Sequence, residues 1–96
     1  MVKNYRGIAE IIRRNQKTLK RLGVRRVGIF GSFAANKTKA SSDVDLVVDF
    51  EKKTFDSYMD LKHFLESRFH RPVDLVLSDS VKPRLRNVIL SSTVYV

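Results

Sequence analysis

The spacing of apolar residues along the chain predicts where its helices lie. Between positions 4 and 22, isoleucine and leucine recur about every 3.6 residues, which is typical of an amphipathic helix. Gly23 follows this segment, and glycine favours the left-handed backbone that ends a helix. The same period over 55–69 predicts a second helix, which Pro72 terminates. Pro83 suits the first position of a further helix near the end of the chain.

Three apolar runs between these helices predict strands, over 24–30, 43–50 and 73–77. The middle run alternates, because side chains of a strand point to its two faces in turn. One face would carry Val44, Leu46, Val48 and Phe50, and the other Asp43, Asp45, Val47 and Asp49. The middle strand therefore has one apolar and one acidic face.

The order of these elements predicts the fold class. Helices and strands alternate, with a short helical turn over 33–35 and a polar loop over 36–42 between the first two strands. We therefore predict an α/β (α+β) fold, in which helices flank a small mixed three-stranded sheet as a single domain over residues 1–96. The tail over 94–96 is either a contact for a partner or a short terminal strand.

Composition narrows the class of protein. Hydrophobic residues make up 43% of the 96 positions and charged residues 30%, which is typical of a soluble globular domain. The absence of cysteine excludes a disulfide scaffold, a thiolate metal site and a cysteine nucleophile. No apolar run approaches the roughly 20 residues of a membrane span, so we expect no membrane contact and a cytoplasmic location.

The charges are unevenly distributed along the chain. Residues 1–42 carry a net charge of +10, residues 43–80 a net charge of −4, and the tail three further basic residues. Such asymmetry is typical of a protein that meets a polyanion, either a nucleotide, a nucleic acid or an acidic protein surface. The plainer interpretation is a solvated basic helix with no specific role.

The residues best suited to chemistry lie between Gly31 and Asp45. Gly31 and Ser32 stand where a strand gives way to a helical turn, and there glycine admits a phosphate close to the backbone while the hydroxyl donates to it. Asp43 and Asp45 are two residues apart on a strand, so both carboxylates would lie on one side. Such a pair favours a bound hard cation, and Mg²⁺ prefers oxygen ligands and substrate phosphates.

A third carboxylate, that of Asp74, lies in an otherwise apolar strand. If that strand neighbours the middle one, Asp74 joins Asp43 and Asp45 in a site for two metal ions, as in phosphoryl or nucleotidyl transfer. Each acid also has a plainer interpretation: a turn before the strand, an exposed face, or a partner for Arg71. Their combination with Gly31 favours the transfer site over coincidence.

The stretch from Gly31-Ser32, across ten residues, to Asp43-x-Asp45 resembles the signature of the DNA polymerase β-like nucleotidyltransferases. The segments 71–76 and 82–86 are similar to those of its minimal nucleotidyltransferases. The resemblance implies a polymerase β palm-like fold that uses ATP and Mg²⁺. It also implies a hetero-oligomer with a helical HEPN toxin, an RNase that the chain would neutralise by transferring AMP to one of its tyrosines.

Carried over by position, the resemblance gives each residue a role. Gly31 and Ser32 would hold the triphosphate, Asp43 and Asp45 would hold both metal ions, and Asp74 would be the third ligand and the base that activates the attacking hydroxyl. The family usually has arginine where this chain has Ala35, which leaves as an alternative an antitoxin that acts mainly by occupying its partner with a weak active site. A third interpretation is RNA contact through the basic first helix.

Overall fold

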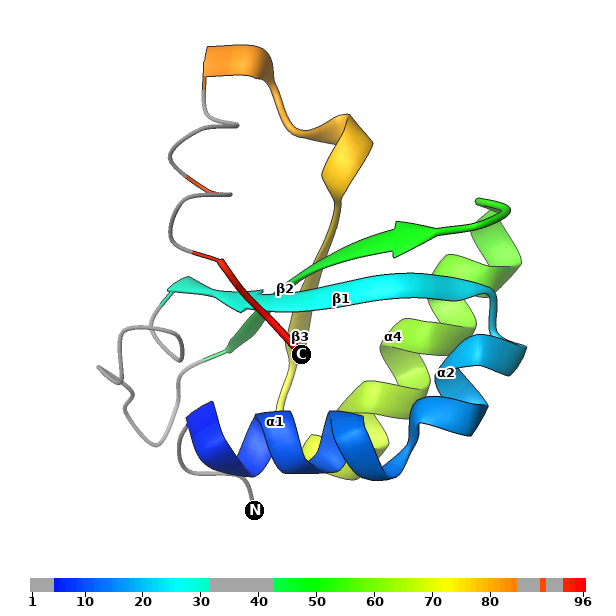
Figure 1. Ribbon diagram of the computed structural model, residues 1–96, viewed down its shortest axis with the longest axis vertical. Helices are drawn as coiled ribbons and strands as arrows, with labels where there is room; N and C mark the ends of the chain where they lie inside the picture. Colours follow the sequence, from blue (N-terminus) through cyan, green and yellow to red (C-terminus); the bar gives the residue numbers. More distant parts are fainter. Residues whose placement is uncertain (1–4, 32–42, 85–88, 90–92) are drawn as a thin grey trace.

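The computed structural model describes residues 5–31, 43–84, 89 and 93–96, in which helices cover one face of a sheet (Figure 1). The helices are α1 (Tyr5–Arg14), α2 (Gln16–Arg21) and α4 (Phe55–Phe69). The strands are β1 (Val24–Phe30), β2 (Val44–Phe50), β3 (Val73–Leu77) and β4 (Val94–Tyr95), with a 3-10 turn, η1 (Ser78–Ser80), after β3. None of the helices in these ranges is both long and apolar enough to cross a bilayer.

The sheet has four strands in the order β3-β2-β1-β4. β1 runs antiparallel to both β2 and β4, whereas β2 and β3 are parallel because α4 carries the chain back across the sheet. The predicted mixed sheet flanked by helices is confirmed, with one strand more than the three expected. The tail supplies that strand, since Tyr95 pairs with Gly28 and the Val96 amide donates to the Val27 carbonyl over 3.0 Å.

The first helical segment departs from the prediction, because it forms two helices rather than one. Asn15 lies between α1 and α2 with φ −110° and ψ 23°, outside the helical range. Its side-chain amide donates to the Ile11 carbonyl over 2.7 Å, and this local bond competes with continued helix. Gly23 ends α2 as predicted, with φ +88° and its amide donating to the Lys20 carbonyl.

The helix α4 and the strand β3 have the bounds that the sequence predicts. Thr54 begins α4, because its hydroxyl accepts a 3.0 Å bond from the Ser57 amide. His70 ends it in the left-handed conformation, before Pro72. The predicted helical turn over 33–35 lies outside the described residues, as does most of the helix expected to open at Pro83.

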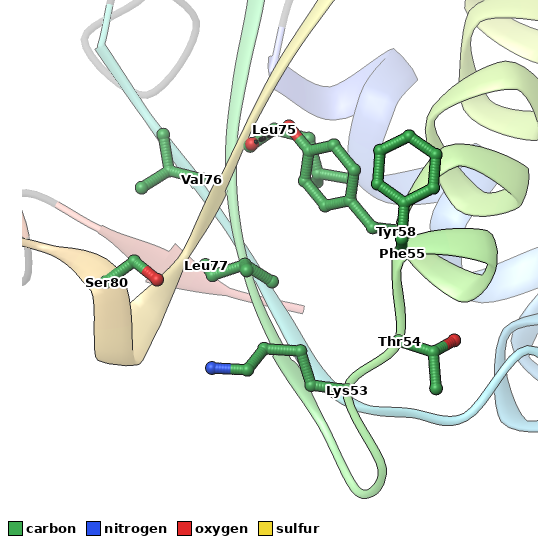
Figure 2. Close-up of a pocket in the computed structure, with 8 residues that line it drawn as sticks. All are labelled: Lys53, Thr54, Phe55, Tyr58, Leu75, Val76, Leu77 and Ser80. Atoms are coloured by element: carbon green, nitrogen blue, oxygen red, sulfur yellow. Dashed lines mark hydrogen bonds between the residues drawn. The ribbon is translucent and has the colours of Figure 1, made fainter.

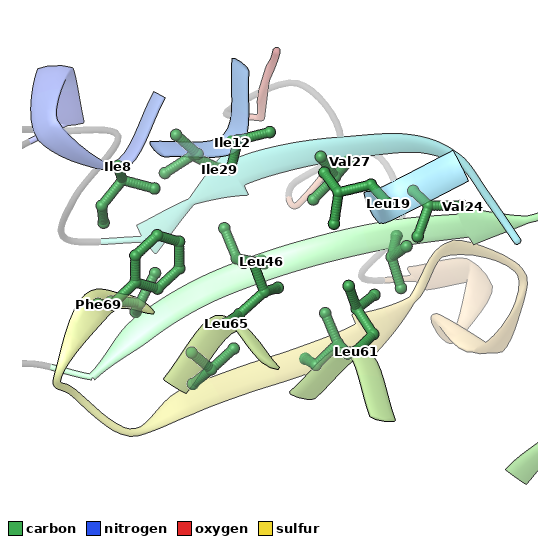
Figure 3. Close-up of a cluster of buried hydrophobic side chains, with 14 of the residues drawn as sticks. Ile8, Ile12, Leu19, Val24, Val27, Ile29, Leu46, Leu61, Leu65 and Phe69 are labelled. Carbon is green, nitrogen blue, oxygen red and sulfur yellow. The ribbon is translucent and has the colours of Figure 1, made fainter. Parts of the chain in front are cut away.

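Helices and sheet are held together by one cluster of buried apolar side chains (Figure 3). The cluster takes Ile8 and Ile12 from α1, Leu19 from α2, Leu61, Leu65 and Phe69 from α4, and Val27, Ile29, Leu46 and Leu75 from the sheet, among others. Burying each Leu, Ile or Phe side chain stabilises the fold by roughly 1.5–3 kcal/mol. A bulge in β1 between Val24 and Arg26 lets Val24 join the cluster, although strict alternation would turn it away.

Side chains of α4 also bond to the outer edge of β3. The Val73 amide donates to the Glu66 carboxylate over 2.9 Å, and the Tyr58 hydroxyl donates to the Leu75 carbonyl over 2.6 Å. In a parallel pair, alternate residues direct their backbone groups away from the neighbouring strand. Val73 and Leu75 are such residues, since the carbonyl of Pro72 accepts the bond from Val44 on β2.

Candidate active site

Two of the predicted aspartates lie side by side on the face of the sheet opposite to α1, α2 and α4. Asp45 of β2 and Asp74 of β3 are partners in the parallel register. Residues paired across neighbouring strands direct their side chains to the same face, and here it is opposite to Leu46 and Leu75 of the core. Asp43 directly precedes β2, two residues before Asp45. The structure therefore places the predicted acids at one end of the sheet.

Gly31 lies at the same end of the sheet, beside Asp45 and on the side away from Asp74. It directly follows Phe30, the residue of β1 that pairs with Asp45, and has φ +71°. A β-carbon at Gly31 would lie 3.0 Å from Cγ of Asp45 and closer still to its Oδ2. The backbone thus passes directly against the Asp45 carboxylate, an approach that only glycine permits. Ser32, the predicted partner of Gly31, lies outside the described residues, and so does Ala35.

The three carboxylates act on one another electrostatically. Burial raises the pKa of the Asp45 carboxyl, and the negative charges of Asp74 and then Asp43 raise that pKa further. Asp45 is half-buried, whereas Asp43 and Asp74 are exposed. Within the described ranges, no hydrogen-bond donor or cation is paired with any of the three. A cation bound between them would relieve this repulsion.

Asp49 lies on the same face of β2, but its carboxylate has hydrogen-bond and ion-pair partners. Its Oδ2 accepts bonds from Nε and Nη2 of Arg26 over 3.1 and 2.9 Å, and its Oδ1 accepts from the Ser78 hydroxyl. The Arg26 guanidinium also lies over the Tyr95 ring, 4.2 Å from its centroid. Sequence alternation placed Asp49 on the same face as Asp45, and only the tertiary structure separates their roles.

The donors suit a hard cation, because carboxylate oxygens are the ligands of Mg²⁺ in proteins. Among the described residues, however, no three histidine, cysteine or acidic side chains converge closely enough to hold a metal ion. Mg²⁺ keeps several of its water ligands and is usually bound through one or two carboxylates together with substrate phosphates. Asp45 and Asp74 with a nucleotide fit that description. His63 and His70 are both exposed on the surface.

A pocket of about 490 Å³ lies elsewhere, between the start of α4 and β3 (Figure 2). It is lined by Lys53, Thr54, Phe55, Tyr58, Leu75, Val76, Leu77 and Ser80, and by none of the three aspartates. Its walls are mostly apolar, and the amine of Lys53 at its rim is paired with Asp79 over 2.9 Å. No pattern in the sequence indicates this pocket, because α4 and β3 form it only when they pack together. None of its lining residues is a carboxylate that could hold a metal ion.

Comparison with known proteins places the chain in a family. The model of the family described as "Polymerase beta, Nucleotidyltransferase" matches residues 8–96. The protein adenylyltransferase MntA of Thermococcus cleftensis is 37% identical over 91 residues, which cover 93% of this chain and 92% of that protein.

Solved structures agree with that placement. One described as a minimal nucleotidyltransferase superposes with a TM-score of 0.83 at 30% identity, over 95% of this chain and 94% of its own. An MNT antitoxin in complex with a tri-AMPylated HEPN toxin of Shewanella oneidensis shares the fold with a TM-score of 0.57 at 19% identity, over 86% of this chain and 69% of its own. The chain belongs to the polymerase β nucleotidyltransferase family and is an enzyme of that class.

Proposed function

We propose that this enzyme transfers AMP from ATP to a tyrosine hydroxyl of a HEPN toxin and thereby neutralises it. The observation that carries the proposal is the pair Asp45 and Asp74, in register on neighbouring strands, uncompensated among the described residues, with Gly31 packed against Asp45. The adenylyltransferase named among its relatives supports AMP as the group transferred. The AMPylated toxin bound to a structural neighbour supports the class of partner, and a hetero-oligomer is the form in which the two would meet.

In this proposal each residue has a defined task. Asp43, Asp45 and Asp74 would hold two Mg²⁺ ions. When bound, these ions would neutralise charge on the triphosphate. The backbone at Gly31 and the hydroxyl of Ser32 bind the phosphates. The exposed carboxylate of Asp74 accepts the proton of the acceptor hydroxyl, whose oxygen forms a bond to the α-phosphorus while the bond to pyrophosphate breaks. A cytoplasmic reaction fits a chain without cysteine.

Ala35 supports a second candidate function. A chain that lacks the arginine usual at this position in the family would bind its toxin tightly but transfer AMP slowly, so that occupation of the partner does most of the neutralising. The two candidates differ in whether the neutralised toxin carries AMP. RNA contact, which the basic first helix also suggests, would be independent of both candidates.

The test is to incubate the chain with its cognate HEPN toxin, Mg²⁺ and ATP labelled at the α-phosphate. We expect label on the toxin, located on a tyrosine by mass spectrometry and abolished by EDTA. Asp45→Asn and Asp74→Asn should each lose transfer, whereas Asp49→Asn should keep it because Asp49 is paired with Arg26 and Ser78. A tight complex without label would favour occupation, and full transfer by folded Asp45→Asn would refute the site.

A further inference from the structure

The outward surface of α1 and α2 carries a run of basic side chains that the transfer site does not use. Arg13, Arg14, Lys17, Lys20 and Arg21 are all exposed, and we call them the α1–α2 basic surface. The apolar sides of both helices pack onto the sheet face opposite to Asp45 and Asp74. The basic surface and the acidic site therefore lie on different sides of the molecule, and a ligand of one would not block the other.

Most of the charge on this surface is not neutralised within the protein. Arg14 is paired with Glu10, one turn earlier on α1, and both side chains are largely exposed. Over the ranges that the structure describes, no carboxylate is paired with the other four members. Exposed like charges on adjacent turns repel one another, so such a cluster carries an electrostatic cost that a bound polyanion would remove.

Helix stability alone does not account for the cluster. Basic residues near the carboxyl end of a helix are favoured by its dipole, which explains Arg13 and Arg14 in α1 and Lys20 and Arg21 in α2. Lys17 is the second residue of α2, where the same dipole disfavours a positive charge, and neither helix has an acidic residue in its first turn. The pattern thus goes beyond what the helices themselves need.

The neighbourhood favours a nucleic acid over an acidic protein as the ligand. At a protein interface, arginines usually act together with aromatic or large apolar side chains that form its buried centre. The large apolar side chains exposed in the described ranges are Phe55, Val94 and Tyr95, none of them in α1 or α2. Binding through the phosphate backbone needs only cations that can follow a strand. We propose that the α1–α2 basic surface binds the phosphate backbone of nucleic acid, independently of base sequence.

The proposal predicts a defined dependence on salt. Single-strand binding weakens with a log–log slope of about 0.7 for each phosphate neutralised, so four to five contacts give a slope near −3 and a loss of about a hundredfold in affinity between about 50 and 200 mM salt. The probe is a fluorescent RNA of mixed sequence, read by anisotropy, beside a DNA of the same sequence and a second RNA of scrambled sequence. All three should bind alike, because no base-reading group is involved.

A matched pair of variants separates this surface from the net charge of the chain. Lys17→Glu with Lys20→Glu should weaken RNA binding at least tenfold and reduce the salt slope by about 1.4, the value for two phosphate contacts. Lys82→Glu with Arg84→Glu makes the same change in net charge at exposed positions of the segment 81–84, and should change binding less than threefold. That segment, drawn in orange, lies far from α2 (Figure 1). Lys17→Gln with Lys20→Gln repeats the test without placing acidic groups in α2.

Every other outcome overturns the proposal. Equal losses in the two variants would mean that RNA responds to net charge alone. A different affinity for the scrambled RNA would mean that the protein reads bases. No RNA binding at low salt would mean that nucleic acid is not the ligand of this surface. If RNA binding is unchanged while Lys17→Glu with Lys20→Glu slows association with the HEPN toxin, the ligand is an acidic protein face. AMP transfer is measured in parallel and should stay unchanged, since the site lies on the opposite side of the sheet.

Discussion

Replacing Gly31 by alanine tests the closeness of the backbone to Asp45. Gly31 has φ +71°, a conformation that costs an L-residue about 1–2 kcal/mol. In addition, the new β-carbon would lie 3.0 Å from Cγ of Asp45, against 3.4–4 Å for ordinary van der Waals contact. The carboxylate must therefore shift, and a misplacement on the order of 1 Å at a reacting centre costs about a hundredfold in rate. We expect Gly31→Ala to lose AMP transfer to that extent.

Gly23 supplies the matched control, because it has the same backbone conformation without the close neighbour. Its φ is +88°, and a β-carbon there would lie 4.0 Å from its nearest neighbours in the described part of the chain, the Lys52 carbonyl oxygen and the Phe50 ring. Gly23→Ala should lose the same 1–2 kcal/mol, about 5 °C in melting temperature for each kcal/mol in a domain of this size, with transfer unchanged. Thermal unfolding and the labelled-toxin assay are run on both variants. Equal transfer rates in Gly31→Ala and the parent would refute the contact with Asp45.

The remaining predictions concern stability. Without metal at neutral pH, Asp45→Asn should stabilise the chain by on the order of 0.5 kcal/mol, because it removes a charge that is partly buried and is opposed by Asp74 across the strands. The pKa of Asp45 is raised in the folded state, so the parent loses stability as the pH rises from the ordinary carboxyl pKa through the folded one. The advantage of the variant should therefore vanish only when the pH falls below about 4, where the carboxyl is protonated in both states. Thermal unfolding in EDTA across this range checks it, and an advantage that grows in acid would contradict the sign. Tyr58→Phe should lose about 1 kcal/mol with the bond to Leu75, whereas Tyr5→Phe, whose hydroxyl has no partner among the described residues, should be neutral. Equal melting temperatures for the two would mean that the Tyr58 bond contributes nothing.

Local signals predicted most of the fold, and the exceptions arise from long-range or side-chain bonds. The helix α4 and the strand β3 follow from an apolar period and from Pro72, both of which are visible in a short window of sequence. The break at Asn15 depends on a side-chain bond to Ile11 that no periodicity reveals. The strand β4 is two residues long and pairs with residues far away in the sequence, so its formation depends on β1 already being in place.

The sequence was sufficient to select the residues of the candidate site, but not to predict how they are placed and which of them have partners. The spacing of Asp43 and Asp45 fixes their common side of β2, and the position of Asp74 in β3 follows from the order of the elements. The sequence cannot tell Asp45 from Asp49, because both have the same alternation. That difference comes from Arg26, which reaches Asp49 across the sheet, and from Ser78 in the turn after β3.

The bonds from α4 to the outer edge of β3 have a consequence for how the protein associates. An exposed edge strand invites a strand of another molecule, and sheets grow into aggregates by that route. Here the Val73 amide donates a hydrogen bond to Glu66, and the Leu75 carbonyl accepts one from Tyr58. An incoming strand would have to displace both side chains before it could pair with β3. The opposite edge is the two-residue β4, too short to template a further strand. Pairing between the edge strands of two molecules is thus opposed at both edges of the sheet. Contacts with other molecules would instead use side chains on the two faces of the sheet.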